Sequence, residues 1–292
     1  MKNILTPRFL IGILTIAFAA AGCSDLKDTL PATTLATGVH PDGWLTKTSK
    51  DFHGEAIRGQ GWDMRSCKTC HGGTYAGGTS GVTCRTCHTE TLGPEHCNVC
   101  HGSANNSAPP RDLKGNTATT FRGVGEHQVH VLGTARSAAV GCSDCHVLPS
   151  GGIYDTTHIG ANPGQAEITL IGGLASRATS GVTPVPVYYA ESASCANTYC
   201  HGAFRNGNGI NPVFWNGGAA LSTACGSCHG DVSKTTLAEQ ALPKTAAQGG
   251  NHPNNLACSN CHDGVINASM NFTNSSKHID GYLNLFGQDR EF

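Results

Sequence analysis

The sequence is poor in the residues that fill an ordinary protein core. Hydrophobic residues make up 38% of its 292 positions and aromatic residues 6%, whereas glycine alone occupies 38 positions. A chain with so few large apolar side chains struggles to offset its ordering entropy by side-chain burial alone. Either much of the chain is disordered, or something other than side chains fills the interior. The 15 cysteines and 15 histidines favour the second alternative.

Clusters of positive charge are also missing. Removal of residues 1–22 would take away Lys2 and Arg8 and leave 17 basic against 20 acidic side chains, a balance of −3. Proteins that bind nucleic acids present a basic patch or stripe. We therefore expect no nucleic-acid partner.

Long hydrophobic runs are lacking after the N-terminus. The stretch FLIGILTIAFAAAG follows Lys2 and Arg8 and is too short to span a bilayer comfortably. These features predict a signal peptide over residues 1–22 and hence an exported protein. No second stretch of spanning length follows, so we expect the mature chain to be soluble or tethered.

The signal peptide ends in Ala20-Ala21-Gly22-Cys23, which resembles a bacterial lipobox, although Ala20 stands where leucine is commoner. This ending predicts that Cys23 is lipidated and that residues 23–45, a polar segment, form a tether. Lipidation would also give a role to a cysteine that belongs to no other motif. The alternative is cleavage within the run 19–21 without a lipid.

The cysteines fall into a repeated pattern, and six sites have the form C-x-x-C-H. They are Cys67/Cys70/His71, Cys84/Cys87/His88, Cys97/Cys100/His101, Cys142/Cys145/His146, Cys225/Cys228/His229 and Cys258/Cys261/His262. This spacing is the signature of c-type haem attachment, because two thiols must reach the two vinyl groups on one porphyrin edge. The adjacent imidazole then points at the iron as its proximal ligand. A zinc ribbon or a disulfide framework does not need a histidine after every second cysteine.

A seventh site departs from this spacing, since four residues separate Cys195 from Cys200 before His201. One lipidated cysteine and twelve in the six motifs leave Cys195 and Cys200 as a pair. A disulfide could use them but would not explain His201-Gly202, and the same Cys-His-Gly ending recurs at Cys70, Cys100 and Cys228. We predict a seventh haem here, and hence seven haem c groups in all.

The histidine supply fits two imidazoles on every iron. Seven histidines follow a second cysteine and are the predicted proximal ligands: His71, His88, His101, His146, His201, His229 and His262. Seven of the other eight are the candidate distal ligands: His40, His53, His127, His130, His158, His252 and His278. His96 ranks last because its backbone adjoins Cys97 and is committed to the edge of that haem. Met64 and Met270 are alternatives, although methionine more often serves packing.

His127 and His130 in GVGEHQVHVLG are the most informative distal candidates. They are three residues apart, so on a helical turn they share a face. They would then reach two irons in neighbouring haems. The alternative is an exposed polar helix that carries two ordinary histidines.

The spacing of the sites divides the chain into two modules. Residues 46–165 form an N-terminal module with four haems, and residues 166–292 form a C-terminal module with three. Residues 167–173 and 182–189 have β-type composition, but Pro184 and Pro186 restrict the second segment to an edge. Alternation from Ile266 to Phe272 indicates a half-buried strand. The predicted fold is a multihaem cytochrome c, mostly coil with short helices and a few short strands around a haem-packed core.

These motifs carry a resemblance to a known family. The C-x-x-x-x-C-H site of Cys195 to His201, followed about 25 residues later by the C-x-x-C-H site of Cys225 to His229, resembles a domain of multihaem c-type cytochromes from Geobacter-type metal-reducing bacteria. CKTCHGG, GPEHCNVCHG and VGEHQVH are similar to that group as well. The resemblance implies exported chains of bis-histidine haems that move electrons between periplasm, outer membrane and external acceptors. Two departures are the imperfect lipobox and the seven sites, where relatives often have more.

We therefore expect an electron carrier without catalytic residues. Seven haems on the mature chain leave roughly 39 residues per haem, too few to insulate neighbours from each other. Its expected location is the outer membrane, as a lipoprotein on the periplasmic or cell-surface face. Expected partners are other cytochromes or redox proteins, the membrane through the lipid, and metal oxides that take electrons at exposed haem edges. The alternatives are a multihaem reductase with one open haem and a subunit of a polymerised extracellular cytochrome filament.

Overall fold

A computed structural model describes residues 39–102, 108–109, 111–159, 166–209, 213–217 and 224–291. The predicted signal peptide, Cys23 and most of the 23–45 tether lie outside these residues, as does the end of the first module at residues 160–165. The chain divides into two compact units, Met1–Gln60 and Gly61–Phe292. In the part that is described, no helix combines the length and the apolar character needed to cross a membrane.

The described part of the first unit folds around Trp44. The imidazole of His40 stacks on the indole with ring centres 4.3 Å apart, and the ring of His53 lies 6.1 Å from it. The carbonyl of Trp44 accepts hydrogen bonds from the backbone N–H and the Nδ1 of His53, both at 2.9 Å. His53 begins helix α2 (His53–Gly59), so these bonds hold the start of the helix against the preceding turn.

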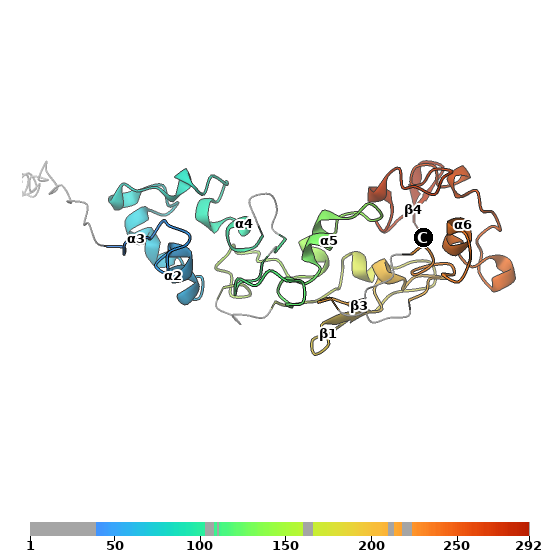
Figure 1. Cartoon of the computed structure of the whole chain (residues 1–292), viewed down its shortest axis with the longest axis horizontal. Helices are drawn as coiled ribbons and strands as arrows, with labels where there is room; N and C mark the ends of the chain where they lie inside the picture. The colour runs from blue at the N-terminus through green and yellow to red at the C-terminus, as the bar shows by residue number, and fades with distance from the viewer. Residues whose placement is uncertain are drawn as a thin grey trace, which may run out of the picture. The chain divides into compact units, whose positions relative to one another are not determined.

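Helices in the second unit are one or two turns long. They are α3 (Lys68–His71), α4 (Cys97–Cys100), α5 (His127–Leu132) and α6 (Leu237–Ala241). Single 3-10 turns occupy Arg65–Cys67, Gly78–Ser80, Cys84–Thr86, Gly93–Glu95, Cys142–Asp144, Leu174–Ser176, Tyr199–His201, Ala246–Gln248, Cys258–Asn260 and Ser275–Lys277. Irregular segments join these short elements (Figure 1). The prediction of a chain that is mostly coil with short helices and a few short strands is confirmed.

Two small antiparallel sheets complete the regular structure of the described residues. Strands β1 (Val187–Tyr189), β2 (Ser194–Ala196) and β3 (Val213–Phe214) pair in the order β1-β2-β3. The edge position of β1 agrees with the restriction predicted from Pro184 and Pro186. Strands β4 (Leu283–Leu285) and β5 (Gln288–Arg290) form a hairpin. Its two turn residues, Phe286 and Gly287, both have positive φ, as a tight two-residue hairpin turn requires.

The strand predicted from Ile266 to Phe272 is wrong. Only its two ends pair with each other, and the residues between them form a turn. The Asn267 side chain accepts hydrogen bonds from the backbone N–H groups of Ser269 and Asn271, both at 3.0 Å, and Met270 has a φ of 60°. An asparagine that bonds its own downstream backbone favours a turn over a strand, and this outweighs the alternating pattern.

Few apolar side chains are buried in the described residues. The large ones are Met64, Tyr75, Val124, Leu170, Tyr199 and Val265. Several others near the cysteine motifs are exposed, including Leu132 (57%), Val147 (52%) and Leu148 (53%). Exposed apolar side chains that cluster mark surfaces for a ligand or a partner. The apolar side chains therefore do not by themselves make an ordinary core in this part of the chain.

Candidate metal centres

Five of the six C-x-x-C-H motifs fold as one turn of helix, whereas the motif of Cys225 to His229 forms a non-helical turn with Gly226 at a φ of 91°. The histidine N–H bonds to the carbonyl of the first cysteine at Cys84 (3.0 Å), Cys97, Cys142 and Cys258 (2.9 Å each). Residues four apart on a helical turn share a face, and the second cysteine, three after the first, lies on the same face. The turn therefore presents both thiols and the imidazole toward one side.

The longer motif reaches a similar turn by a different route. Cys195 lies in β2, the central strand of its sheet, opposite Tyr188 on one side and Val213 on the other. The turn Tyr199–His201 follows, and the N–H of His201 bonds to the carbonyl of Thr198 at 3.1 Å. Two extra residues thus place the first cysteine in a sheet. Both cysteines are free among the described residues.

Histidines from the motifs meet the predicted distal candidates in five pairs. The distances between ring centres are 5.9 Å for His101–His158, 6.2 Å for His127–His146, 6.1 Å for His130–His201, 6.4 Å for His229–His278 and 6.4 Å for His252–His262. Metal–imidazole bonds of about 2 Å on opposite sides of one iron place the two ring centres about 6 Å apart. Every pair therefore has the spacing of two axial ligands.

The Nδ1 atom of most paired histidines donates to a backbone carbonyl. The Nδ1 atoms and their acceptors are His127 to Val124, His130 to Glu126, His146 to Glu167, His158 to Ile153, His229 to Ala241, His252 to Pro253, His262 to Asn284 and His278 to Arg136. A carbonyl can only accept, so these bonds fix the proton on Nδ1 and leave the Nε2 lone pair for a metal. Histidines that bind metals are typically held in this way.

The Nδ1 of His96 accepts a hydrogen bond instead of donating one. Its Nδ1 accepts a hydrogen bond from the backbone N–H of Asn98 at 3.3 Å and caps α4. An accepting Nδ1 leaves the proton on Nε2, which then has no lone pair for a metal. This geometry agrees with the prediction that His96 is the spare histidine, and it supplies a chemical reason that the sequence did not.

Several candidate ligands belong to none of the five histidine pairs. His71 donates from Nδ1 to the carbonyl of Val82 at 3.0 Å, as most of the paired histidines do to other carbonyls. His40 and His53 belong to the first unit, and the partners of His71 and His88 stay a prediction. Met64 is buried and its carbonyl lies 3.2 Å from the hydroxyl of Tyr75.

Burial favours the neutral form of five of the paired imidazoles. It lowers the pKa of His101, His127, His229 and His278, and it lowers the pKa of His201 to about 4. A neutral imidazole is the form that binds a metal. Within the described residues, no group of three or more histidine, cysteine or acidic side chains is arranged to hold a metal ion. Each histidine pair provides two imidazoles, the number of axial ligands that a porphyrin-bound iron takes.

Most sites that are consecutive in sequence are also neighbours in space. Burial is the largest cause that raises the pKa of Cys84, Cys145, Cys200 and Cys258, and hydrogen bonds oppose it in part at Cys200 and Cys258. A thiol of another motif also raises each value: Cys67 for Cys84, Cys200 and Cys195 for Cys145, Cys228 for Cys200, and Cys225 for Cys258. The charge of His146 likewise lowers the pKa of His101, after burial and His158. These contacts connect the third to the seventh site in sequence order and the first site to the second.

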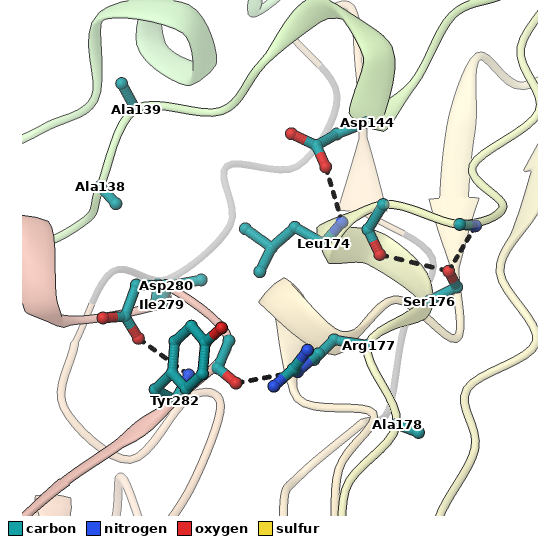
Figure 2. A pocket seen from close by; sticks show the side chains of 13 residues that line it. Ala138, Ala139, Asp144, Leu174, Ser176, Arg177, Ala178, Ile279, Asp280 and Tyr282 are labelled. Atoms are coloured by element: carbon teal, nitrogen blue, oxygen red, sulfur yellow. Dashed lines mark hydrogen bonds between the residues drawn. The ribbon is translucent and has the colours of Figure 1, made fainter. Parts of the chain in front are cut away.

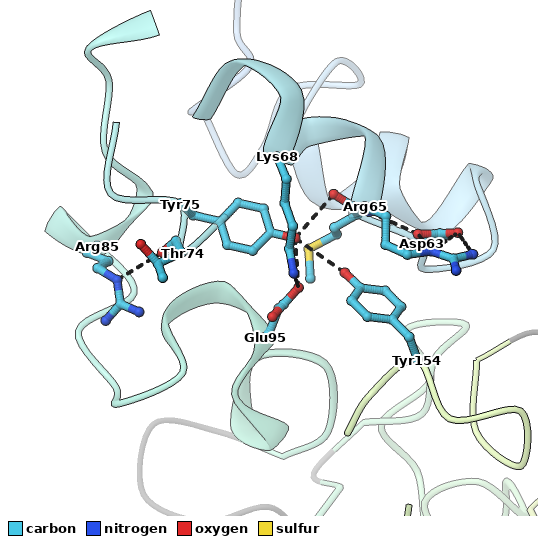
Figure 3. A network of polar contacts seen from close by, with 9 residues as sticks. Asp63, Arg65, Lys68, Thr74, Tyr75, Arg85, Glu95 and Tyr154 are labelled. Atoms are coloured by element: carbon cyan, nitrogen blue, oxygen red, sulfur yellow. Dashed lines mark hydrogen bonds and ion pairs between the residues drawn. The ribbon is translucent and has the colours of Figure 1, made fainter. Parts of the chain in front are cut away.

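A polar cluster joins the first and third motifs (Figure 3). The buried Tyr75 hydroxyl donates to Glu95 at 2.8 Å and lies 3.3 Å from the hydroxyl of Tyr154. Lys68, inside the first motif, forms an ion pair with Glu95 at 2.7 Å. Burial opposes ionisation of Glu95, but its hydrogen bonds, led by Lys68, outweigh burial and lower its pKa. Tyr154 lies four residues before His158, so the cluster also anchors the loop that carries this ligand. Sequence analysis missed the cluster, since its members are far apart in the chain.

A cavity of about 570 Å³ adjoins the fourth and sixth sites (Figure 2). Asp144, next to Cys145, lines it together with Asp280, two residues after His278. The guanidinium of Arg177 lies 4.8 Å from the ring centre of Tyr282, and its Nε donates to the carbonyl of Gly281 at 3.0 Å. The volume of the cavity is within the range of ordinary ligand pockets.

Comparison with known proteins identifies one segment. Residues 194–229 match a family model described as the Geobacter CxxxxCH...CXXCH motif. The match covers the site of Cys195, Cys200 and His201 and the following site of Cys225, Cys228 and His229, and it supports the recognition of a multihaem c-type cytochrome with covalently bound haem c. No curated protein and no solved structure matches the chain.

Proposed function

We propose that this chain is an electron-transfer protein that binds seven c-type haems, each held by two cysteines and between two histidines. The observation that carries the proposal is the set of five histidine pairs with ring centres 5.9 to 6.4 Å apart. Each pair joins the histidine of a cysteine motif to one from elsewhere in the chain. The family match over residues 194–229 supports the same chemistry. When bound, haem c supplies an iron that takes up and releases single electrons.

The cysteines attach the haems and the histidines orient them. The proposed attachment residues are Cys67, Cys70, Cys84, Cys87, Cys97, Cys100, Cys142, Cys145, Cys195, Cys200, Cys225, Cys228, Cys258 and Cys261. The backbone carbonyls bonded to Nδ1 hold each imidazole in the tautomer and rotation that present Nε2 to the iron. The exposed apolar side chains beside the motifs, such as Leu132 and Val147, supply apolar surface for the porphyrin faces. The haems would then form the packed interior that the side chains lack.

Two histidines on one iron leave no position for a substrate. This supports a carrier over a reductase at the five paired sites, and we propose no catalytic residues. His40 and His53 are further proposed distal ligands. Metal oxides would take electrons at exposed haem edges, without a dedicated site.

The sequential arrangement of sites supports electron hopping along the chain. Burial is the main cause of the raised pKa of Cys84, Cys145 and Cys258, and a thiol of an adjacent motif adds to each value, which supports a close spacing of these sites. We propose that the order of haems in space follows the order of motifs from the third to the seventh site.

The location and partners follow from the predicted N-terminus. We propose an exported outer-membrane lipoprotein, anchored through Cys23, that exchanges electrons with other cytochromes or redox proteins and with external acceptors. Mass spectrometry of the mature N-terminus tests the anchor. A lipid-modified Cys23 at the mature N-terminus is expected, whereas cleavage within residues 19–21 without a lipid contradicts it.

Haem counting and spin state test the proposed function. A pyridine haemochrome assay on purified holoprotein should give seven haems per chain, and electron paramagnetic resonance (EPR) should show only low-spin iron. The reduced protein should not bind carbon monoxide. A count of six would contradict the seventh site at Cys195 and Cys200, and a high-spin haem that binds carbon monoxide would favour the reductase.

A further inference from the structure

The indole of Trp215 touches two candidate ligands that belong to different sites. Its ring centre lies 4.6 Å from that of His127, edge to face, and 5.6 Å from that of His130. His127 pairs with His146 of the fourth motif, and His130 pairs with His201 of the fifth. One side chain therefore packs against the distal imidazoles of two successive sites.

Hydrogen bonds hold both the indole and the backbone of Trp215 in place. The indole N–H donates to the carbonyl of Arg122 at 2.8 Å, just before α5, and the backbone N–H donates to the carbonyl of Ala193 at 2.7 Å. Ala193 is buried and precedes β2, the strand that carries Cys195. The tryptophan thus connects the sheet that holds the fifth attachment site to the helix that holds two distal ligands.

Gly125 leaves the space that the indole occupies. A Cβ at this position would lie 2.1 Å from Nε1 of Trp215, well inside any allowed contact, and the residue has a φ of +42°. The backbone just before α5 can approach the indole this closely because residue 125 has no side chain. The position of the Trp215 indole therefore depends on the glycine at position 125.

We propose that Trp215 is a positioning residue shared by His127 and His130, which sets the orientation of the distal ligands at two neighbouring haems together. The inference rests on the proposed function, because it assigns those histidines to irons. α5 has only six residues, from His127 to Leu132, and a helix this short has little stability of its own. Packing against Trp215 supplies the rigidity that two ligands on one short helix require. A disturbance of the indole should consequently affect two haems and leave the others unchanged.

Trp215→Leu tests this in the full-length holoprotein. Covalent haem content should stay at the wild-type value, since no cysteine changes. The EPR signals of two haems should shift, and up to two equivalents of carbon monoxide should bind per reduced chain, against none in the wild type. Trp215→Phe keeps an aromatic ring and should restore most of the wild-type spectrum. Trp62→Phe is the matched control, and its spectrum should not change.

Gly125→Ala provides a second perturbation that leaves the indole in the sequence. The added methyl group must displace the ring, so the same two-haem signature is expected if Trp215→Leu does not accumulate. Unchanged spectra in Trp215→Leu or Gly125→Ala, or changes spread over all the haems, would overturn the inference. A wild-type protein without low-spin haem would instead overturn the proposed function, so the two failures are distinct.

Discussion

Removal of one distal imidazole should open one ligand position on the iron of one haem and leave the other haems unchanged. His158 lies 5.9 Å from His101 between ring centres, and its Nδ1 donates to the carbonyl of Ile153 at 2.8 Å. His158→Ala removes one of the two ligands of one iron but leaves Cys97, Cys100 and His101 in place. Covalent attachment should therefore continue, and the open position should bind a small ligand.

The size of the effect follows from the number of sites. With seven haems, loss of one distal ligand removes a seventh of the low-spin EPR intensity, or about 14%, since each bis-histidine iron contributes equally. Reduced protein should bind one equivalent of carbon monoxide per chain, measured by optical difference titration. Imidazole added to the buffer should reverse both changes, because it supplies the missing ligand.

His96→Ala is the matched control, since it removes the same side chain next to the same motif. His96 accepts the backbone N–H of Asn98 through Nδ1 and caps α4, so its replacement should cost about 0.5–2 kcal/mol of stability. It should not change spin state or create carbon monoxide binding. If His96→Ala opened a haem and His158→Ala did not, the pairing by ring spacing and tautomer would be refuted.

Three further predictions follow from the ring planes and the polar cluster. Two classes of low-spin EPR signal are expected from the angles between paired imidazole planes. The near-parallel pairs His252–His262 (13°) and His127–His146 (19°) should give rhombic signals, and the crossed pairs His130–His201 (66°) and His229–His278 (79°) should give strongly axial ones. A single class of signal would contradict these angles. Tyr75→Phe removes a buried hydroxyl that donates to Glu95 and should lower the free energy of unfolding by about 1–3 kcal/mol, as measured by denaturant titration, whereas the exposed Tyr189→Phe should change it little. The pKa of Glu95 is lower in the folded protein than its value near 4.5 in the unfolded chain, so the ionised carboxylate stabilises the fold above pH 4.5. This stabilisation is lost as the pH falls through the folded pKa, and Glu95→Gln should therefore flatten the acid side of the curve of stability against pH. An unchanged curve would show that the ion pair with Lys68 contributes nothing.

The spacing of cysteine and histidine was enough to predict the local part of each site. A turn that places Cys97, Cys100 and His101 on one side is a property of neighbouring residues, and it appears in the structure where the motif predicts it. The count of histidines also predicted that distal ligands would be available. The pairing could not be predicted, because His101 meets His158 and His229 meets His278 only through contacts between distant segments.

The carbonyl acceptors were equally invisible in the sequence. Any backbone carbonyl can accept from Nδ1, and nothing about Ala241 or Asn284 marks them as partners of His229 and His262. Trp215 was missed for the same reason, since it lies far along the chain from the helix that it touches. The glycine at position 125, two residues before His127, was the available signal, because a residue without a side chain beside a ligand indicates a close approach by something large.

The longer motif at Cys195 has a structural reason. A C-x-x-C-H turn needs only local hydrogen bonds, so its first cysteine is positioned by the turn itself. Cys195 is instead positioned by two neighbouring strands, and β3 of the same sheet leads directly into Trp215. The two additional residues, with Asn197 at a φ of 55°, let the chain leave the strand and still form the turn Tyr199–His201. The site that departs from the common spacing is thus the one whose proposed attachment cysteine is built into the same framework as His127 and His130, the proposed distal ligands of two haems.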